Sequence, residues 1–141
     1  MNYVDKQYQA HEVVCREGDI SSNDLLFVLS GNLLVVTKQG TEIKVLNRIG
    51  AKEFIGELSF FDTKPRTASI ISTEPTTIRV FPRNELYQKL PSWFTQIGTG
   101  ITRKIRTMDR ILHESKIKKS SLKEHKPLTI DEQRKILQVL S

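Results

Sequence analysis

The sequence is poor in the residues that mark disulfide-bonded, metal-binding or membrane-spanning proteins. Its single cysteine, Cys15, allows no disulfide within the chain, as is usual in a reducing cytoplasm. The three histidines, His11, His113 and His125, form no metal-ligand spacing with that cysteine. No apolar run approaches the length that spans a bilayer, and the N-terminus lacks the apolar core of a secretion signal. The composition therefore predicts a cytoplasmic protein without a metal site or a membrane span.

Positive charge is concentrated in the C-terminal third of the chain. The 141 residues carry a formal net charge of +6, yet residues 1–98 hold 11 basic and 11 acidic side chains. Residues 99–141 hold the other 11 basic side chains and only 5 acidic ones. Any attraction to nucleic acid or to an acidic partner would therefore come from this C-terminal part. The length fits one domain with a sizeable core.

The first 81 residues have the pattern of short β-strands separated by turns. Strands are predicted at residues 13–15, 25–29, 33–37, 42–49, 67–73 and 76–81, with a hairpin turn at residues 38–41. Residues 1–12 are polar and are predicted to be a short lead-in. Strands of this length and spacing are typical of a sandwich or a barrel.

From Arg83 onward the pattern becomes helical. A short helix is predicted at residues 84–90, and a longer one begins at Pro91-Ser92. Apolar residues three or four positions apart form one stripe along it: Phe94, Ile97, Ile101, Ile105, Met108 and Leu112. We expect the N-terminal half of this stripe to pack on the strands. Gly98 and Gly100 weaken the helix and favour close packing or a bend.

The last 26 residues are predicted to be a separate region. Residues 116–126 are basic and polar, which indicates a solvated linker, with nucleic-acid contact as the less favoured alternative. Thr129, Asp131 and Glu132 then indicate the start of a short helix with an apolar end. The chain is thus divided into a domain at residues 1–115 and a linker with a terminal helix at residues 116–141.

Residues 54–71 combine the features of an anion-binding segment. Gly56 lets the backbone come close to a ligand, and a short helix after it offers free N–H groups to an anion. Arg66 can present a planar, bidentate charge to a phosphate, and Glu57 can accept hydrogen bonds from a hydroxyl. Taken alone, Glu57 and Arg66 are more simply explained as a surface ion pair.

Four motifs in a fixed order favour the ligand-binding interpretation. They are Arg16-Glu17-Gly18-Asp19, Val28-Leu29-Ser30-Gly31, Phe54-Ile55-Gly56-Glu57-Leu58 and Pro65-Arg66-Thr67-Ala68. With these motifs, about residues 8–112 resemble the cyclic nucleotide-binding domain of the catabolite activator protein, protein kinase regulatory subunits and cyclic nucleotide-gated channels. The resemblance implies an α+β, mainly β fold: an antiparallel β-roll, or double-stranded β-helix jelly roll, with C-terminal helices. In one departure, Lys52 stands where the family often has glycine.

The resemblance also implies a ligand and a role for each residue of the segment. The ligand would be a cyclic purine nucleotide, with cyclic AMP preferred to cyclic GMP. Arg66 would pair with the cyclic phosphate, and Glu57 would accept the ribose 2′-hydroxyl. Further phosphate contacts would come from the cassette that begins at Gly56, through backbone N–H groups at Leu58, Ser59 and Ala68. The hydroxyl of Thr67 would add a donor to the phosphate or to the base.

Residues outside the segment would complete the pocket. The resemblance places Val35, Leu46 and Asn47 near the sugar and base. It also implies that the long helix meets the base, where Lys104 and Thr107 are candidates together with Arg106, Met108 and Arg110. Gly18 and Gly31 match structural turn glycines and not ligand contacts.

The predicted function is a cyclic nucleotide sensor that relays ligand binding to an unknown protein effector through movement of the C-terminal helix. The C-terminal half of that helix is a possible homodimer contact, as in family dimers. The alternative is the ligand-binding part of a DNA-binding transcription regulator whose DNA-binding domain is absent from this chain. We expect no catalysis, because no nucleophile–base pair is present and the clustered histidines of a metal-dependent β-roll are missing.

Overall fold

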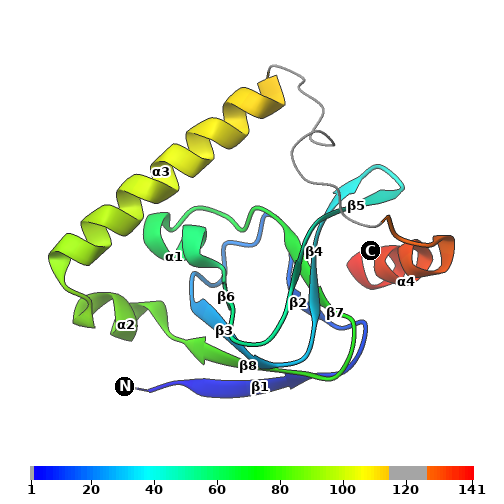
Figure 1. Ribbon diagram of the computed structural model, residues 1–141, viewed down its shortest axis with the longest axis horizontal. Coiled ribbons are helices and arrows are strands. Elements are labelled where there is room, and N and C mark those ends of the chain that lie inside the picture. Colours follow the sequence, from blue (N-terminus) through cyan, green and yellow to red (C-terminus); the bar gives the residue numbers. More distant parts are fainter. Residues whose placement is uncertain (1, 115–126) are drawn as a thin grey trace.

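The computed structural model describes residues 2–114 and 127–141. Within these ranges, eight strands form two four-stranded antiparallel sheets (Figure 1). The first sheet has the order β1-β8-β3-β6 and the second the order β2-β7-β4-β5. The strands are β1 Val4–Tyr8, β2 Val13–Cys15, β3 Leu25–Ser30, β4 Leu33–Gln39, β5 Glu42–Ile49, β6 Phe54–Ile55, β7 Ser69–Ser72 and β8 Thr76–Phe81. This architecture confirms the predicted mainly β jelly roll with C-terminal helices.

The main core lies between the two sheets. Every second residue of β8 is buried, which places Ile78 and Val80 inside, because side chains alternate between the faces of a strand. These residues pack with buried side chains of both sheets: Leu26, Val28, Leu33, Ile49, Ile55 and Ile70. Removing these apolar surfaces from water stabilises the roll that carries the candidate site.

Strand β1 corrects the prediction of a lead-in at residues 1–12. It pairs antiparallel with β8, from Val4 opposite Val80 to Tyr8 opposite Thr76. Most of its side chains are exposed, because it lies at the edge of its sheet. An ion pair between Asp5 and Arg79, 2.8 Å long, fixes it to β8. An exposed edge strand needs no apolar alternation, so the sequence pattern gave no sign of it.

Three of the four helices in the described residues follow the last strand, and α1 lies between β6 and β7. The helices are α1 Glu57–Asp62, α2 Arg83–Lys89, α3 Ser92–Glu114 and α4 Ile130–Leu140. The predicted start of α4 is confirmed by a capping box, in which the Thr129 hydroxyl accepts the Glu132 N–H and the Glu132 carboxylate accepts the Thr129 N–H. No helix of the described residues is long and apolar enough to cross a bilayer. The predicted linker at residues 116–126 lies outside the described residues.

Helix α4 lies against the outer face of the second sheet (Figure 1). Its Ile136 is buried beside Val36 and Ile43, in a second core that includes Leu34 and Ile71. The guanidinium of Arg16 donates to the carbonyls of Val139 and Leu140 and so caps the helix C-terminus. Residues 127–141 therefore pack on the second sheet and cover its outer face.

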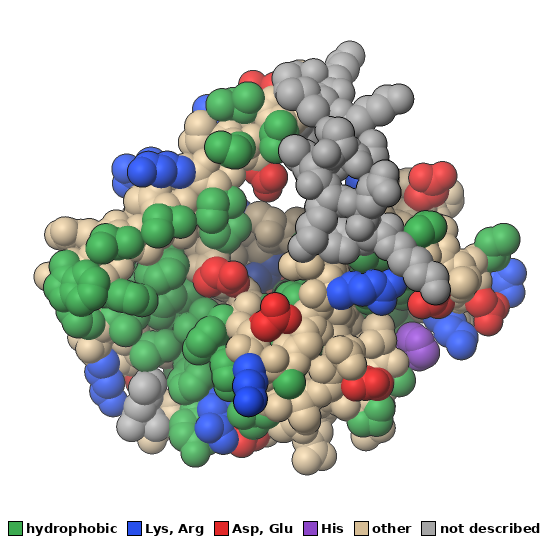
Figure 2. Space-filling model, in the orientation of Figure 1, with side chains coloured by type: hydrophobic (Ala, Val, Ile, Leu, Met, Phe, Trp, Pro, Cys, Tyr) green, Lys and Arg blue, Asp and Glu red, His purple; other side chains and the backbone are tan. Residues whose placement is uncertain are grey.

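The apolar stripe of α3 faces away from the sheets, so the prediction for its N-terminal half was wrong. Ile97 is 54% exposed and Ile101 52%, and hydrophobic side chains follow the helix on the surface shown in Figure 2. The helix meets α1 instead, through the ring of Phe94 against Phe61 and through a neighbouring row that includes Gly98 and the buried Thr102. At Gly98 an added Cβ would lie 2.1 Å from the Phe61 ring, so only glycine permits this approach.

Candidate binding site

The segment that begins with β6 forms a tight turn, a short helix and a loop. Gly56 caps the N-terminus of α1 in the left-handed conformation, with φ of 79°. An added Cβ there would lie 2.2 Å from Nη1 of Arg66, so glycine is needed both for the backbone and for this contact. Thr63, also left-handed, ends the helix, and the loop then returns to β7.

Arg66 is the buried cation of the site, with only 6% of its surface exposed. Its guanidinium donates to the carbonyl oxygens of Gly56 at 3.0 Å and Asp24 at 2.8 Å. Its backbone is held by the loop before β3, because its N–H donates to Asp19 and its carbonyl accepts from Gly18. None of the described carboxylates forms an ion pair with it. The fold thus holds a buried charge that is hydrogen-bonded to carbonyls and has no described carboxylate within ion-pair distance.

A cavity of about 320 Å³ opens beside Arg66, between the segment and the second sheet. The structure brings nine of the predicted binding residues together in its wall. They are Val35, Asn47, Gly56, Glu57, Leu58, Ser59, Arg66, Thr67 and Ala68. This volume lies at the small end of the range of ligand pockets.

Three predicted residues do not line this cavity. Leu46 is half-buried in β5, at an irregularity where Val35 pairs with Asn47 and Val36 pairs with Val45. Lys104 and Thr107 are exposed on α3, and Thr107 lines a different cleft, between α1 and α3. The roles of these three residues remain predictions.

The cavity wall also contains residues to which the sequence analysis gave no ligand role. Cys15 and Ile70 come from β2 and β7, which pair with each other. Burial raises the pKa of the Cys15 thiol, and the nearby Arg66 charge offsets only part of this effect. Cys15 is therefore a neutral, apolar part of the wall. Only the pairing of two strands more than 50 residues apart reveals this role.

The turn before the segment contains a lysine in a backbone conformation that favours glycine. Lys52 adopts the left-handed conformation, with φ of 69°. Its N–H donates to the Val28 carbonyl at 2.8 Å, and the Glu53 carbonyl accepts the Val28 N–H at 3.0 Å. The hydrogen bonds to β3 thus hold a lysine where the family often has a glycine.

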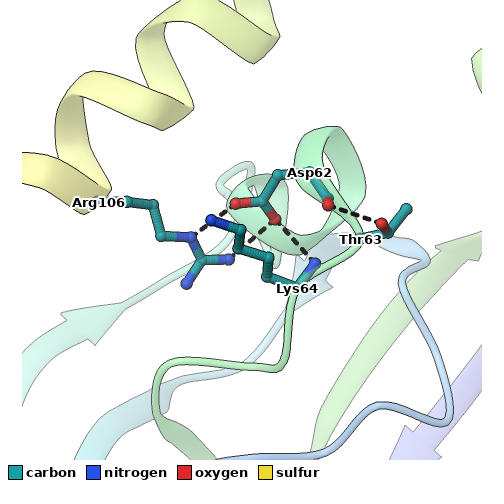
Figure 3. A network of polar contacts seen from close by, with 4 residues as sticks. All are labelled: Asp62, Thr63, Lys64 and Arg106. Carbon is teal, nitrogen blue, oxygen red and sulfur yellow. Dashed lines mark hydrogen bonds and ion pairs between the residues drawn. The ribbon is translucent and has the colours of Figure 1, made fainter.

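The C-terminal end of α1 is tied to α3 by an ion pair. Figure 3 shows Arg106 of α3 facing Asp62, with Nε–Oδ2 and Nη2–Oδ1 distances of 2.7 and 3.0 Å. Burial raises the pKa of Asp62, but the hydrogen bonds from Arg106 and the Lys64 N–H outweigh burial and hold it below its ordinary value. The carboxylate is therefore ionised at neutral pH and links the two helices.

The chain belongs to the cyclic nucleotide-binding domain family. Residues 5–92, more than half of the chain, match that family. The match spans the two sheets and the cavity around Arg66. No cluster of histidine, cysteine or acidic side chains in residues 2–114 and 127–141 could hold a metal ion.

Individual known proteins share the sequence or the fold over most of the chain. Lysophospholipase nte1 of Aspergillus fumigatus is 29% identical over 120 residues. The matched region covers 82% of this chain but only 8% of the length of that relative. The cAMP-bound form of the EAL enzyme Bd1971 has a TM-score of 0.66 at 16% identity, covering 84% of this chain and 32% of that one. The cAMP complex of the Toxoplasma gondii PKA regulatory domain has a TM-score of 0.61 at 15% identity, and the match covers 75% of this chain and 39% of that one. At such identities the two structures show a common fold.

Proposed function

We propose that this chain is a cyclic nucleotide sensor that binds its ligand in the cavity beside Arg66. The observation that carries the proposal is the buried guanidinium without a carboxylate partner among the described residues. Two carbonyls use two of its five N–H donors. A cyclic phosphate offers one negative charge and acceptor oxygens, which a buried guanidinium needs. The similar solved structures with bound cAMP support this choice.

The other cavity residues have complementary roles in the proposal. Glu57 is exposed at the start of α1 and accepts the ribose 2′-hydroxyl. The first intrahelical donor of α1 is the Phe60 N–H, so those of Leu58 and Ser59 are available to the phosphate. Cyclic AMP is the preferred ligand and cyclic GMP the second candidate. Lys104 and Thr107 reach the base only when α3 approaches the cavity.

Calorimetric titration of cyclic AMP and cyclic GMP tests this proposal. We expect Arg66→Ala to weaken binding about tenfold or more, because a hydrogen bond to a charged group contributes about 1.5–3 kcal/mol. The matched control is Arg79→Ala, which removes an exposed arginine of β8 and leaves the affinity unchanged. Thermal melting of both variants separates lost binding from lost folding. Unchanged affinity in a folded Arg66→Ala variant contradicts the proposal.

Ligand binding is proposed to move α3 and so signal to a protein effector that the sequence does not identify. Helix α1 carries cavity residues at its start and contacts α3 at its end, through Phe61 and Asp62. Spin labels at Lys44 of β5 and Asp109 of α3 test the movement, in a Cys15→Ala background that still binds ligand. Identical distance distributions with and without cyclic AMP contradict it.

The nucleotide is expected to be recovered unchanged, since the module is proposed not to be an enzyme.

The exposed face of α3 is proposed to pair with a second copy of the chain. Phe94, Ile101 and Met108 are seven residues apart, as are Ile97, Lys104 and Ile111, which is the spacing of a coiled-coil seam. All five apolar members are at least 42% exposed. We expect Ile101→Glu to abolish a dimer in sedimentation equilibrium. The control Ile20→Glu, at an isoleucine 73% exposed outside α3, leaves it intact. A monomeric wild-type chain contradicts this proposal.

The alternative, the sensor part of a DNA-binding regulator, requires a DNA-binding domain, which residues 2–114 and 127–141 do not form. The described residues after α3 form one helix, α4, whose Ile136 is buried against the sheet. Retention of the chain on DNA that falls with salt favours the alternative. No retention at low salt favours the sensor that signals to a protein.

A further inference from the structure

A second cleft lies between α1 and α3, separate from the cavity beside Arg66. It encloses about 460 Å³, and no residue of its wall belongs to the cavity beside Arg66. Four basic side chains, Lys64, Arg103, Arg106 and Arg110, line it together with one carboxylate, Asp62. Its wall therefore has three more positive than negative charges. A concave surface with this imbalance concentrates anions.

The basic side chains of α3 lie on one face of the helix, where they repel each other. Arg103, Arg106 and Arg110 are three and four positions apart, where like charges on a helix repel each other. Asp62 neutralises Arg106 alone. Arg103 and Arg110 are exposed and have no hydrogen-bond or ion-pair partner among the described residues. Their guanidinium groups are thus free to bind a doubly charged phosphate from two sides.

The remaining wall fits an organic group more than a bare ion. Phe61 contributes a half-buried ring, and Thr99 and Thr107 contribute hydroxyls. The volume falls within the range of small-molecule pockets. We infer that this cleft binds a phosphorylated small molecule, with its phosphate between the arginines of α3 and its apolar part against Phe61.

Titrations of inorganic phosphate and phenyl phosphate into the full chain test the inference by NMR at constant ionic strength. The amide signals of Thr99 and Thr107 are expected to shift and to saturate. Phenyl phosphate is expected to bind about threefold more tightly or better, because it adds an apolar ring at similar charge. Shifts confined to residues 56–59 and 66–68 mean that phosphate enters the other cavity and overturn the inference. Equal affinities of the two compounds overturn the placement of an apolar group at Phe61.

Charge-matched double variants provide the second measurement. Arg103→Gln with Arg110→Gln removes two exposed charges of the cleft and is expected to weaken phenyl phosphate binding about tenfold. Lys44→Gln with Arg48→Gln removes two exposed charges of β5 and is expected to leave it unchanged. Circular dichroism confirms that both variants are folded. Equal weakening in both pairs shows diffuse attraction to a basic surface and overturns the inference.

Discussion

The two ends of the short helix α1 use arginine in opposite ways. At its N-terminal end, Arg66 is buried, donates to two carbonyls and has no carboxylate partner among the described residues. At its C-terminal end, Arg106 forms a bidentate pair with Asp62. A neutralised arginine connects two helices, whereas an arginine held by carbonyls retains its charge for a ligand. The same residue type therefore supports structure at one end and recognition at the other.

The largest effect is expected from Gly56→Ala, which disturbs the N-terminal end of α1. The new Cβ would lie 2.2 Å from Nη1 of Arg66, in a left-handed conformation that costs about 1–2 kcal/mol for other residues. We expect cyclic AMP binding to fall about tenfold or more in calorimetry. Gly40→Ala is the control, because it is also left-handed but has open space around its Cβ position. Equal affinities of the two variants contradict the requirement for glycine beside Arg66.

The next largest effect is expected from Gly98→Ala, which pushes α3 away from the C-terminal end of α1. Its Cβ would lie 2.1 Å from the Phe61 ring, and overpacking of this kind costs about 1–3 kcal/mol. Gly100→Ala meets open space two residues further along the same helix and is expected to stabilise it by about 1 kcal/mol. Urea denaturation measures both. A Gly98→Ala variant as stable as Gly100→Ala shows that α3 does not rest on Phe61.

The smallest effect is the pH dependence of the Asp62–Arg106 pair. Because the pKa of Asp62 is lowered in the folded state, the pair stabilises the protein above the unfolded pKa near 4. This contribution is lost as the pH falls through the lowered pKa. We expect Asp62→Asn to cost about 1 kcal/mol in the free energy of unfolding at pH 7, and the difference from wild type to shrink below about pH 4.

An exposed pair provides the control for this titration. Asp5→Asn removes the partner of Arg79 at the sheet edge, where solvent weakens the interaction. We expect a clearly smaller loss of stability at pH 7 than for Asp62→Asn. A loss of equal size would show that the link between α1 and α3 is no stronger than a surface ion pair.

Most of the cavity was predictable because its polar residues are close together in the sequence. Gly56, Glu57 and Arg66 lie within 11 residues, and their motif order indicated both the fold and the segment. Cys15 and Ile70 could not be predicted, because they meet only through the pairing of β2 with β7. Periodicity likewise located the stripe of α3 but not the direction in which it faces. The neighbouring row, at Gly98, makes the close contact with Phe61, and the lack of a side chain at one position is not visible in a pattern of apolar residues.

Helix α4 has a practical consequence for work on a minimal ligand-binding domain. The family match ends at residue 92, before α4 begins, which invites the use of shorter versions that lack α4. Such a version would leave the sheet face around Leu34, Val36 and Ile43 without its cover. Bare β-sheet faces of this kind promote aggregation in solution. Assays of nucleotide affinity are therefore better made on a protein that retains residues 127–141.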